Sequence, residues 1–509
     1  MQTVSKGISP AGRDLVAPVI YDAFGREQFK YLPYIPQSGN MNDGKFKTSP
    51  FAGQAAFYNN RTLNPGVLGD TVYYSRTDFE ASPLNRPLNT YGPGDSWAKN
   101  DLTTVERGGN RPVKMEYLVN TIADSVRIWV MPASGTVPTS TAMYAAGQLY
   151  KNVITDEQGG KVVEYKDKEG QVVLKKVQLA ASPGTAHVGW LCTYYVYDDL
   201  NNLRFVIPPL AVEKIHSTWN AATVATGLCF QYQYDHRRRM IEKRVPGAGP
   251  VHMVYDTRDR LVFTQDSAQR AKAPKEWLVT FYDGLNRPVM TALYPSNSTR
   301  DQLQTAMNAV TGTSSSLNYA IPGPADLVIG NRQTGIASYK ASSSITFQDG
   351  FESEANAEFI AEIDPAYTTG TTTVTVSNPL PGITGYQPLT YTYYDDYTYA
   401  GAKAYVTADT SKLPRVSTQF PEPLLASNMT RGLVTGTKVR VLGTGQWLTT
   451  TLRYDAKGRV IQALSDNLQQ GEDVLTTRYD FSGKVLSTYL HHRNPASGAT
   501  PQTRLLTKH

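Results

Sequence analysis

The chain has 509 residues, of which 40% are hydrophobic and 18% are charged, a balance that excludes an intrinsically disordered protein. This length exceeds what one compact core usually holds, so several domains or one extended repeat are expected. The net charge of +6 is spread over 50 basic and 44 acidic residues, without the clustered basic stripe of a nucleic-acid-binding protein. The 32 tyrosines, against 15 phenylalanines, favour β-sheets with partly polar faces.

The chain begins with the polar segment MQTVSKGISPAG, which lacks the apolar stretch of a signal peptide. No run approaches the roughly 18 consecutive apolar residues that a transmembrane helix needs. By themselves these features indicate a cytosolic protein or a piece of a longer one.

A six-residue pattern that begins with Tyr-Asp recurs along the chain. Its copies are YDAFGR from Tyr21, YDDLNN from Tyr197, YDHRRR from Tyr234, YDTRDR from Tyr255, YDGLNR from Tyr282, YDAKGR from Tyr454 and YDFSGK from Tyr479. In all copies but one the fifth residue is Gly, Asn or Asp, the types that best tolerate the left-handed αL conformation. The sixth residue is basic in all copies but one.

This pattern is typical of a β-hairpin turn. An aspartate at the first turn position accepts hydrogen bonds from backbone N–H groups two residues on. An αL residue three positions later matches a three-residue loop, made of a type I turn and a bulge. Strand-like flanks support this interpretation, as in EWLVTFY before Asp283 and PVMTALY after Arg287. The residues predicted to shape the turns are Tyr21, Asp22, Gly25, Arg26, Tyr197, Asp198, Asn201, Tyr234, Asp235, Tyr255, Asp256, Asp259, Arg260, Tyr282, Asp283, Asn286, Arg287, Tyr454, Asp455, Gly458, Arg459, Tyr479, Asp480 and Gly483.

Two further segments share the Asp-x-x-Gly spacing without the tyrosine. They run from Asp156 to Gly159 and from Asp167 to Gly170, and the strand-like KVVEY links them as in a meander. A catalytic or anion-binding role for Asp256, Asp259 and Arg260 is the alternative to a turn. The same spacing recurs too often for one active site, so we expect the acids to shape the hairpin and Arg260 to anchor or flank it.

Candidate reactive groups elsewhere have structural interpretations. Cys192 and Cys229 lie in strand-like runs and are expected to be buried free thiols, although a disulfide stays open if the protein is exported. The cluster from His236 to Arg239 is expected to be a solvated turn tip rather than an anion site. The neighbours His491 and His492 would point to opposite faces of a strand, which argues against a shared metal. No metal or cofactor is expected.

Residues 296–380 interrupt the repeat pattern. SNSTRDQLQTAMNAV predicts a short helix with a capping box from Ser298 to Asp301, followed by a loop, TGTSSSLNYAIPGPADL. SSSITFQDGFESEANAEFIAEID predicts a pair of strands on both sides of a turn at Gly350, and TTGTTTVTVSNPLPGITG a loop that borders strands. A plug, a lid and an external decoration are all compatible with this insertion.

Motifs of enzymes are missing: there is no Gly-x-Ser-x-Gly, no His-Glu-x-x-His, no Walker loop and no dinucleotide-binding fingerprint. GTGQW, from Gly443, predicts a hairpin turn. Asp395 and Asp396 indicate a strand end rather than a glycosidase dyad or a calcium site. The tyrosines that surround them favour cross-strand pairs over a sugar-stacking surface; they are Tyr391, Tyr393, Tyr394, Tyr397 and Tyr399. We therefore expect that the protein is not an enzyme.

One hairpin every 20 to 27 residues, where copies are consecutive, predicts an all-β repeat protein. Neighbouring hairpins must pair edge to edge, and the resulting antiparallel sheet must coil because strands twist. A propeller, a solenoid and a hollow shell remain open. The expected organisation is a first repeat segment over residues 1–295, the insertion over 296–380 and a second repeat segment over 381–509.

The repeated units resemble the YD repeats of the Rhs family, which are related to the extracellular shells of teneurins. FEASPLNRPLNTYGPGDSW, TYYVYDDLNNLRFVIPP and TRGLVTGTKVRVLG strengthen the likeness, and they resemble exported Rhs-type proteins of Bacteroidota. This resemblance implies repeats coiled into a hollow β-shell that encloses a C-terminal toxin or other cargo. It also implies an exported or surface-displayed protein whose partners are the other segments of its own polypeptide. Secretion machinery and surface glycans are further candidate partners.

Two features lead us to expect a fragment of a larger polypeptide. MQTVS resembles the strand that follows a YD turn, and the chain stops at RLLTKH, where another strand and Tyr-Asp unit would be expected. The leading functional hypothesis is therefore a structural shell segment that encloses or carries cargo absent from this chain. The alternative is a surface module that binds glycans or proteins through tyrosine-rich sheet faces, and a hydrolase is the third hypothesis. No nucleic-acid partner and no membrane span are expected.

Overall fold

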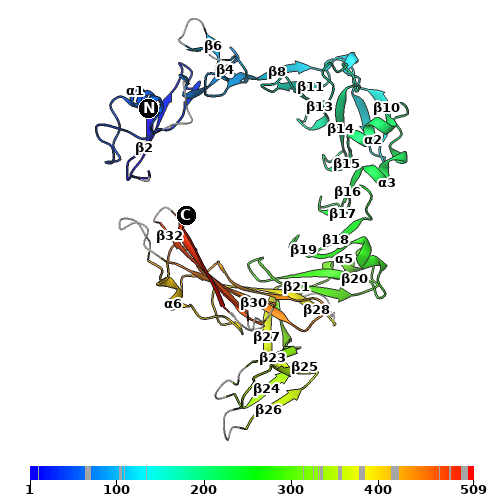
Figure 1. Cartoon of the computed structure of the whole chain (residues 1–509). Coiled ribbons are helices and arrows are strands. Elements are labelled where there is room, and N and C mark those ends of the chain that lie inside the picture. Colours follow the sequence, from blue (N-terminus) through cyan, green and yellow to red (C-terminus); the bar gives the residue numbers. More distant parts are fainter. Residues whose placement is uncertain are drawn as a thin grey trace. The chain divides into compact units, whose positions relative to one another are not determined.

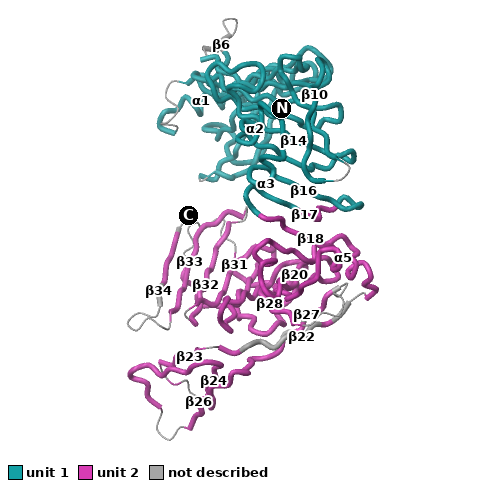
Figure 2. The backbone as a smooth tube through the Cα atoms, turned by 90° about the vertical axis from the view of Figure 1, so that its right-hand side faces the viewer, with its two compact units in different colours: residues 1–238, 243–248 teal, residues 239–242, 249–509 magenta. Residues whose placement is uncertain are grey.

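In the computed structural model of the chain, antiparallel β-strands predominate and helices are short (Figure 1). The structure describes residues 1–509 except 10, 64–69, 102–105, 108, 133–134, 313, 325, 331, 333–335, 354–357, 378–384, 414–422, 469, 481–482, 495–501 and 509. Contacts divide the chain into unit 1, residues 1–238 and 243–248, and unit 2, residues 239–242 and 249–509 (Figure 2). Each unit is described by itself.

Unit 1 is a meander, in which most strands pair with the strand that follows in the chain. Its strands are β1 (Gln2–Ser5), β2 (Leu15–Ile20), β3 (Phe29–Tyr31), β4 (Tyr74–Phe79), β5 (Pro87–Tyr91), β6 (Asn100–Asp101), β7 (Glu106–Arg107), β8 (Val113–Val119), β9 (Arg127–Val130), β10 (Thr139–Met143), β11 (Tyr150–Thr155), β12 (Lys161–Lys166), β13 (Val172–Gln178), β14 (Trp190–Tyr197), β15 (Leu203–Ile207) and β16 (Phe230–Tyr234). The pairs β6–β7 and β9–β10 are separate two-stranded ladders. The helical segments are α1 (Pro50–Asn59), η1 (Ile122–Asp124), α2 (Pro209–Ile215), η2 (Ala221–Thr223) and α3 (Ala225–Leu228). All ladders of the meander are antiparallel, as the hairpin pattern predicts.

The core of unit 1 follows from the two-residue period of its strands. In β14, Cys192, Tyr194 and Val196 are buried on one face, while the residues between them are more exposed. Helix α2 covers this region and contributes Val212 and Ile215 to the same cluster of buried apolar side chains. An amphipathic segment on a half-polar sheet therefore completes the core that the strands cannot close alone.

Unit 2 repeats the meander. Its strands are β18 (Val251–Tyr255), β19 (Leu261–Gln265), β20 (Glu276–Tyr282), β21 (Pro288–Pro295), β28 (Gln387–Tyr394), β29 (Val434–Arg440), β30 (Trp447–Tyr454), β31 (Val460–Asp466), β32 (Glu472–Tyr479), β33 (Val485–Arg493) and β34 (Gln502–Lys508), and β17 (Met240–Arg244) has residues in both units. Its helices are α4 (Ser267–Ala271), α5 (Arg300–Asn308) and α6 (Thr407–Thr410). Trp277 and Phe263 lie fully buried in its apolar core, against Leu303 and Met307 of α5. The all-β fold class with antiparallel hairpins is thus confirmed.

The N-cap of helix α5 lies one residue later than predicted. Its N-cap is Thr299, which forms a capping box with Gln302, so the predicted box from Ser298 to Asp301 is wrong. Both pairs have the required spacing, and the box forms at the later one; Leu303 and Met307 of the helix pack in the core. Gln304 then binds both backbone polar groups of Tyr255 and covers this stretch of β18.

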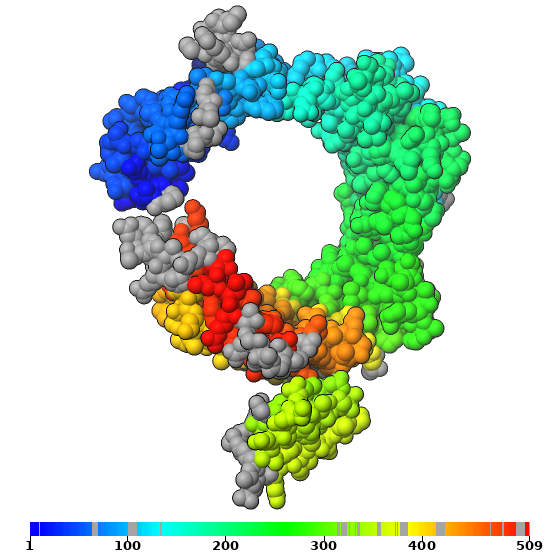
Figure 3. Space-filling model, viewed as in Figure 1, coloured from blue at the N-terminus to red at the C-terminus, as the bar shows by residue number. Residues whose placement is uncertain are grey.

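The remainder of the segment 296–380 forms small ladders within unit 2. Its strands are β22 (Ser314–Pro322), β23 (Asp326–Ile329), β24 (Ser338–Ala341), β25 (Ser344–Phe347), β26 (Ile360–Ile363) and β27 (Thr368–Ser377). In Figure 3 most of this segment is a yellow-green lobe beside the larger orange and green surface of the unit. The whole segment lies within unit 2. The domain boundaries at residues 295 and 380 remain a prediction.

Three predictions in this segment are wrong. The two stretches interpreted as loops contain β22 and β27, which pair with each other in an antiparallel ladder. The strands on both sides of Gly350 do not pair with each other; β25 joins β23 and β26 joins β24, both in parallel. Gly350 itself adopts a φ of 86°, as a turn requires. Residues 378–384 of the predicted loop lie outside the described residues.

Successive antiparallel strands place every second connection at the same edge of a sheet. In unit 2 the connections that contain Asp256, Asp283, Asp395, Asp455 and Asp480 therefore share one edge, which we call the turn edge. In unit 1 the corresponding edge carries Asp22, Asp167, Asp198 and Asp235. The YD pattern thus marks one edge of each sheet.

Candidate functional site

The turn at Asp256 has the geometry of a type I turn followed by a bulge. The Asp256 N–H donates to the carbonyl of Arg260 at 3.0 Å, and the Asp259 N–H donates to the carbonyl of Asp256 at 3.1 Å. One carboxylate oxygen of Asp256 accepts the N–H groups of Arg258 and Arg260, each at 2.9 Å. The other oxygen accepts Nε of Arg260 at 2.6 Å. Asp259 takes the αL conformation with a φ of 62°.

The same arrangement recurs at the other predicted turns. Nε of the sixth-position arginine binds the aspartate at 2.7 Å in the turns of Asp22, Asp283 and Asp455. Asn202 replaces this arginine beside Asp198, and the N–H of Lys484 binds the carboxylate of Asp480 at 2.9 Å. The fifth residue has a positive φ in every copy: Gly25, Asn201, Arg238, Asp259, Asn286, Gly458 and Gly483. Arg238 is the member that sequence reasoning did not single out as an αL former.

At two of these turns the contacts lower the pKa of the aspartate. Hydrogen bonds to the backbone and side chain of Arg26 hold the pKa of Asp22 below its usual range. Burial acts to raise the pKa of Asp455, but hydrogen bonds from Arg459 outweigh burial and lower it. A carboxylate that is held charged and already accepts three bonds is poorly placed to exchange protons with a substrate.

Consecutive turns are joined by an arginine and a tyrosine. The guanidinium of Arg260 lies over the ring of Tyr282 in the next turn, 4.8 Å from its centroid. The Tyr282 hydroxyl donates back to the carbonyl of Leu261 at 2.9 Å, and Arg260 also donates to the carbonyl of Asp283 at 3.2 Å. The turn at Asp256 is therefore joined to the turn at Asp283 through a cation–π contact and two hydrogen bonds.

The same link recurs within each unit, and we call the series the turn ladder. Its cation–π pairs, 4.2–5.0 Å from arginine to ring centroid, are Arg26–Phe79, Arg86–Tyr117, Arg239–Tyr255, Arg260–Tyr282, Arg287–Tyr394 and Arg459–Tyr479. The hydroxyls that donate to a carbonyl of the preceding hairpin, at 2.6–3.3 Å, belong to Tyr117, Tyr197, Tyr234, Tyr255, Tyr282, Tyr394, Tyr454 and Tyr479. The tyrosine of the pattern thus serves the preceding turn rather than its own.

Sequence reasoning missed a turn between β4 and β5. Glu80 takes the place of aspartate, and its N–H donates to the carbonyl of Arg86 at 3.0 Å. Its carboxylate binds the Arg86 guanidinium at 2.7–2.9 Å, while Asn85 supplies the αL residue with a φ of 52°. Arg26 reaches Asn85 at 3.1 Å, as the ladder requires. The longer loop and the glutamate concealed this copy.

A second missed turn begins at Tyr394 and Asp395. The Asp395 N–H donates to the carbonyl of Leu433 at 3.1 Å, which closes the hairpin between β28 and β29. Residues 396–432 fill the loop, and the Gly432 N–H binds the Asp395 carboxylate at 2.6 Å. The sixth-position arginine of the pattern has no counterpart in this turn. The Asp395 carboxylate instead accepts hydrogen bonds from both terminal nitrogens of Arg287, at 3.0 and 2.8 Å. The pKa of Asp395 falls to about 2, chiefly through these bonds.

The long loop between β28 and β29 packs on strands β30 and β31 of unit 2. The Tyr399 hydroxyl lies 2.9 Å from that of Thr451, and the Lys403 N–H donates to the Thr451 hydroxyl at 3.0 Å. Further along, Gln462 of β31 binds both backbone groups of Val406 at 2.8 and 3.1 Å. The loop therefore crosses the strands as a strap, held by a row of buried polar side chains.

The remaining predicted turns lie at different places. Asp167 and Gly170 form a turn at the turn edge of unit 1, and the Tyr197 hydroxyl donates to the next carbonyl, that of Val172. Asp156 and Gly159 form the same turn at the opposite edge. The GTGQW segment connects β29 and β30 as a hairpin, as predicted.

The five tyrosines near Asp395 make contacts inside unit 2. The rings of Tyr393 and Tyr399 stack at 4.1 Å, and Tyr391 packs against Trp447 at 5.1 Å. The hydroxyls of Tyr394 and Tyr397 donate to backbone carbonyls at 3.0 and 2.8 Å. These rings are used in packing, both within the sheet and between the sheet and the strap.

The other candidate groups are dispersed. Burial raises the pKa of Cys192 to about 11 and that of Cys229 to about 12, and both thiols are free. His491 lies 3.7 Å from Asp409, whereas His492 contacts Asp473. Within the described ranges, no three His, Cys, Asp or Glu side chains are grouped to hold a metal ion. No helix among the described residues is long and apolar enough to cross a membrane.

The segment from His236 to Arg239 forms the tip of a turn. His236 and Arg237 are exposed, as predicted for a turn tip. Nε of Arg238 donates to the side-chain oxygen of Asn202 at 3.1 Å, and Arg239 pairs with Asp259 at 2.8 Å. Arg239, which also lies over the Tyr255 ring, therefore belongs to the turn ladder.

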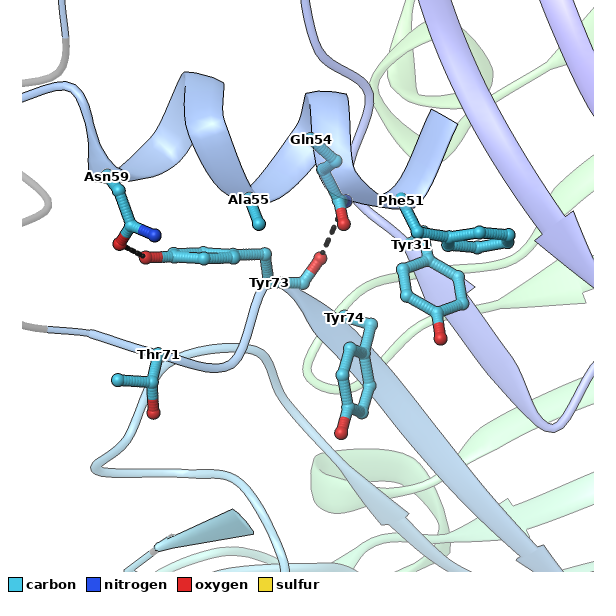
Figure 4. Close-up of a pocket in the computed structure, with 8 residues that line it drawn as sticks. All are labelled: Tyr31, Phe51, Gln54, Ala55, Asn59, Thr71, Tyr73 and Tyr74. Carbon is cyan, nitrogen blue, oxygen red and sulfur yellow. Dashed lines mark hydrogen bonds between the residues drawn. The ribbon is translucent and has the colours of Figure 1, made fainter. Parts of the chain in front are cut away.

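Unit 1 contains an aromatic cavity of about 270 Å³ beside α1 (Figure 4). Tyr31, Phe51 and Tyr73 line it, and the Tyr73 hydroxyl donates to Asn59 at 2.6 Å. Gln54 donates to the carbonyl of Tyr73 at 3.1 Å (Figure 4). Its central polar groups are paired within the wall, so the cavity offers aromatic surface rather than a reactive group.

Replacing Gly458 by valine is expected to destabilise its hairpin by about 1–3 kcal/mol, because a β-branched residue is strained at a positive φ. Gly458 has a φ of 74°, and only ordinary contacts surround a side chain placed there. Hydrogen exchange of the β30–β31 amides would measure the effect.

Two variants control this prediction. Gly458→Asn should be tolerated, because asparagine occupies the same turn position at Asn201 and Asn286. Gly284→Val places the same side chain in open space at a turn residue without a positive φ. Equal exchange in Gly458→Val and the parent would exclude backbone geometry as the reason for the recurring glycine.

Comparisons with known proteins give one family match and several distant structures. Residues 1–109 match a domain of unknown function, DUF6443. A search of curated proteins finds no match. The chain is similar to the crystal structure of TcdB2-TccC3-Cdc42, with a TM-score of 0.34 and 12% identity over 97% of this chain and 18% of that one. It is also similar to TcdB2-TccC3 without the hypervariable C-terminal region, with a TM-score of 0.35 and 12% identity over 96% and 19% of the chains. The chain thus spans about a fifth of the length of these proteins.

Proposed function

We propose that this chain is a wall segment of an exported or surface Rhs-type protein, which encloses or carries an effector or other cargo absent from the chain. The observation that carries this proposal is the turn ladder. It joins neighbouring hairpins through tyrosine hydroxyls and backbone carbonyls, and at turns such as that of Asp256 through an arginine as well. Contacts of this kind stiffen a sheet along its length, which is the property that a wall requires.

The proposal assigns the recurring acids to structure and no catalytic activity to the chain. The Asp256 carboxylate is fully buried and accepts three hydrogen bonds, two from the backbone and one from Arg260. Its partners leave no direction from which a substrate could approach. In the partly exposed copy at Asp22 the carboxylate accepts hydrogen bonds from the same turn positions.

The alternative, a surface module that binds through tyrosine-rich faces, has weaker support. The tyrosines that suggested it stack on one another or donate to backbone carbonyls within unit 2. A glycan array that gave saturable binding, lost in Tyr393→Ala, would favour this alternative.

An electron-microscopy density map of the purified chain tests the wall proposal. The expected result is a curved wall one sheet thick, with the turn ladder along its rim and no density filling the concave side. A compact globule with strands packed face to face would contradict it.

A further inference from the structure

A cavity of about 700 Å³ lies within unit 2, at the sheet edge opposite the turn edge. Its walls come from the hairpin loop before Trp447, from the loop after Asp466 and from the start of β23. The strap contributes Ala400 and Gly401. This volume suits a ligand of one or two sugar rings, and none of these walls belongs to the turn ladder.

Lys438 supplies a buried positive charge to this cavity. It is 4% exposed and lies on β29, directly opposite Thr449 of β30. Among the described residues, none accepts a hydrogen bond from its ammonium group. The nearby carboxylate of Asp466 has other partners: it binds Lys403 at 2.6 Å and accepts the Thr449 N–H at 2.8 Å.

The charge of Lys438 is therefore poorly compensated. Burial lowers the pKa of Lys438, and Asp466 offsets this only in part. Burying an ammonium group without a hydrogen-bond acceptor is unfavourable, and an anionic ligand would remove this penalty. A carboxylate is the anion that a single lysine matches with one charge-assisted hydrogen bond.

The rest of the lining is rich in acceptors. The Gln446 amide nitrogen donates to the carbonyl of Leu468 at 3.4 Å, and no described residue donates to its amide oxygen. One oxygen of Asp326 accepts the Ser344 hydroxyl at 2.6 Å, and no described residue binds the other. Acceptors of this kind match ligand hydroxyls. Trp447, whose ring packs on Tyr391, adds apolar surface for the C–H face of a ring.

We propose that this cavity binds a sugar acid, whose carboxylate meets Lys438 and whose hydroxyls donate to Gln446 and Asp326. The juxtaposition of one buried cation with several acceptors and an indole selects a ligand that carries one negative charge and several hydroxyl groups. This site is separate from the turn ladder, so it adds a binding activity to the proposed wall.

Isothermal titration of the whole chain with D-glucuronate, D-glucose and acetate tests the proposal. Glucuronate should bind saturably and at least tenfold more tightly than either glucose, which lacks the charge, or acetate, which lacks the hydroxyls. Lys438→Met keeps the length and volume of the side chain and should weaken glucuronate at least tenfold. Lys412→Met removes an exposed lysine and should leave binding unchanged.

Gln446→Ala provides a second variant on the loop, in case Lys438→Met disturbs the sheet. It should weaken glucuronate several-fold and leave acetate unchanged. Equal binding of glucuronate and glucose would overturn the proposal, as would full binding by Lys438→Met. Acetate that binds as tightly as glucuronate would assign the site to carboxylates in general, such as acidic peptide side chains, and would exclude the sugar acid.

Discussion

Asp256→Ala is expected to lower the stability of its hairpin in unit 2 by about 3–5 kcal/mol. The Asp256 side chain is fully buried and that of Arg260 is 8% exposed, so the substitution leaves a buried guanidinium without its counter-ion. It also removes the acceptor of the Arg258 and Arg260 N–H groups. Hydrogen exchange of the β18–β19 amides measures this local loss without requiring two-state unfolding of the whole chain.

Asp283→Ala is the matched comparison. It deletes the same bonds in the same type of turn, but Asp283 and Arg287 are 16% and 22% exposed. Water can replace part of what is lost, and Arg287 keeps its ion pair with Asp395, so we expect a smaller cost, about 1–2 kcal/mol. If the β18–β19 amides of Asp256→Ala exchanged hydrogen at the same rates as in the parent, the Asp256 carboxylate would not stabilise the turn.

Asp14→Asn is expected to produce the second large effect, a loss of about 2–4 kcal/mol near the start of unit 1. The Asp14 carboxylate is fully buried, binds Lys47 at 2.6 Å and accepts the N–H groups of Gly7 and Gly44, each at 2.9 Å. The asparagine has a similar shape but no charge, so Lys47 keeps only its ion pair with Asp43, at 3.2 Å.

The loss should depend on pH. Burial acts to raise the pKa of Asp14, but the bonds from Lys47, Gly44 and Gly7 outweigh it and lower the pKa below 3.8. Burial acts to lower the pKa of Lys47, but Asp14 and Asp43 outweigh it and raise the pKa above 10.5. An acid whose pKa is lowered in the folded state stabilises the protein at pH values above its unfolded-state pKa, and this stabilisation is lost as the pH falls through its folded-state pKa. A lysine whose pKa is raised stabilises the protein at pH values below its unfolded-state pKa, and this is lost as the pH rises through its folded-state pKa.

The parent should therefore exceed Asp14→Asn in stability by a constant amount between about pH 5 and 9, and the difference should shrink below about pH 4. Exchange of the β1–β2 amides at several pH values measures this. A difference that stayed constant down to pH 2 would show that the charge of Asp14 contributes nothing.

Sequence reasoning located the turns because their chemistry is local. The aspartate, the αL residue and the arginine lie within six positions, so spacing alone identifies the hairpin at Asp256 or Asp455. Sequence reasoning failed to locate the turns whose loops are longer. Asp395 closes its turn with Leu433, and Glu80 replaces the aspartate in a longer loop, so neither fits a fixed spacing.

Pairing between distant segments was beyond local reasoning. Strand β22 pairs with β27, which lies more than roughly 40 residues further along the chain. The parallel pairs β23–β25 and β24–β26 likewise join strands that are not neighbours in the chain. A Thr- and Ser-rich strand has weak hydrophobic alternation, so its composition resembles that of a loop. The helix cap was mispredicted for a different reason, since two overlapping capping boxes were available and their spacing does not distinguish them.

The link between turns was equally hidden. The pattern contains the tyrosine and the arginine, but the partner of each lies in the neighbouring hairpin, and only the register of the strands brings them together. The recurrence of both residues was the available signal, because a turn by itself requires neither of them.

A double-mutant cycle between Arg459 and Tyr479 tests the turn ladder most directly. Arg459 lies over the Tyr479 ring at 5.0 Å and donates to the carbonyl of Asp480 at 2.8 Å, while Tyr479 donates to Val460 at 3.0 Å. The cycle of Arg459→Ala and Tyr479→Leu subtracts the loss within each turn and isolates the contact between them. We expect a coupling of about 1 kcal/mol for this pair and none for Arg459 with Tyr255, which belongs to a turn further along the sheet. Additive losses for Arg459 and Tyr479 would contradict the account, because the hairpins would then be independent units.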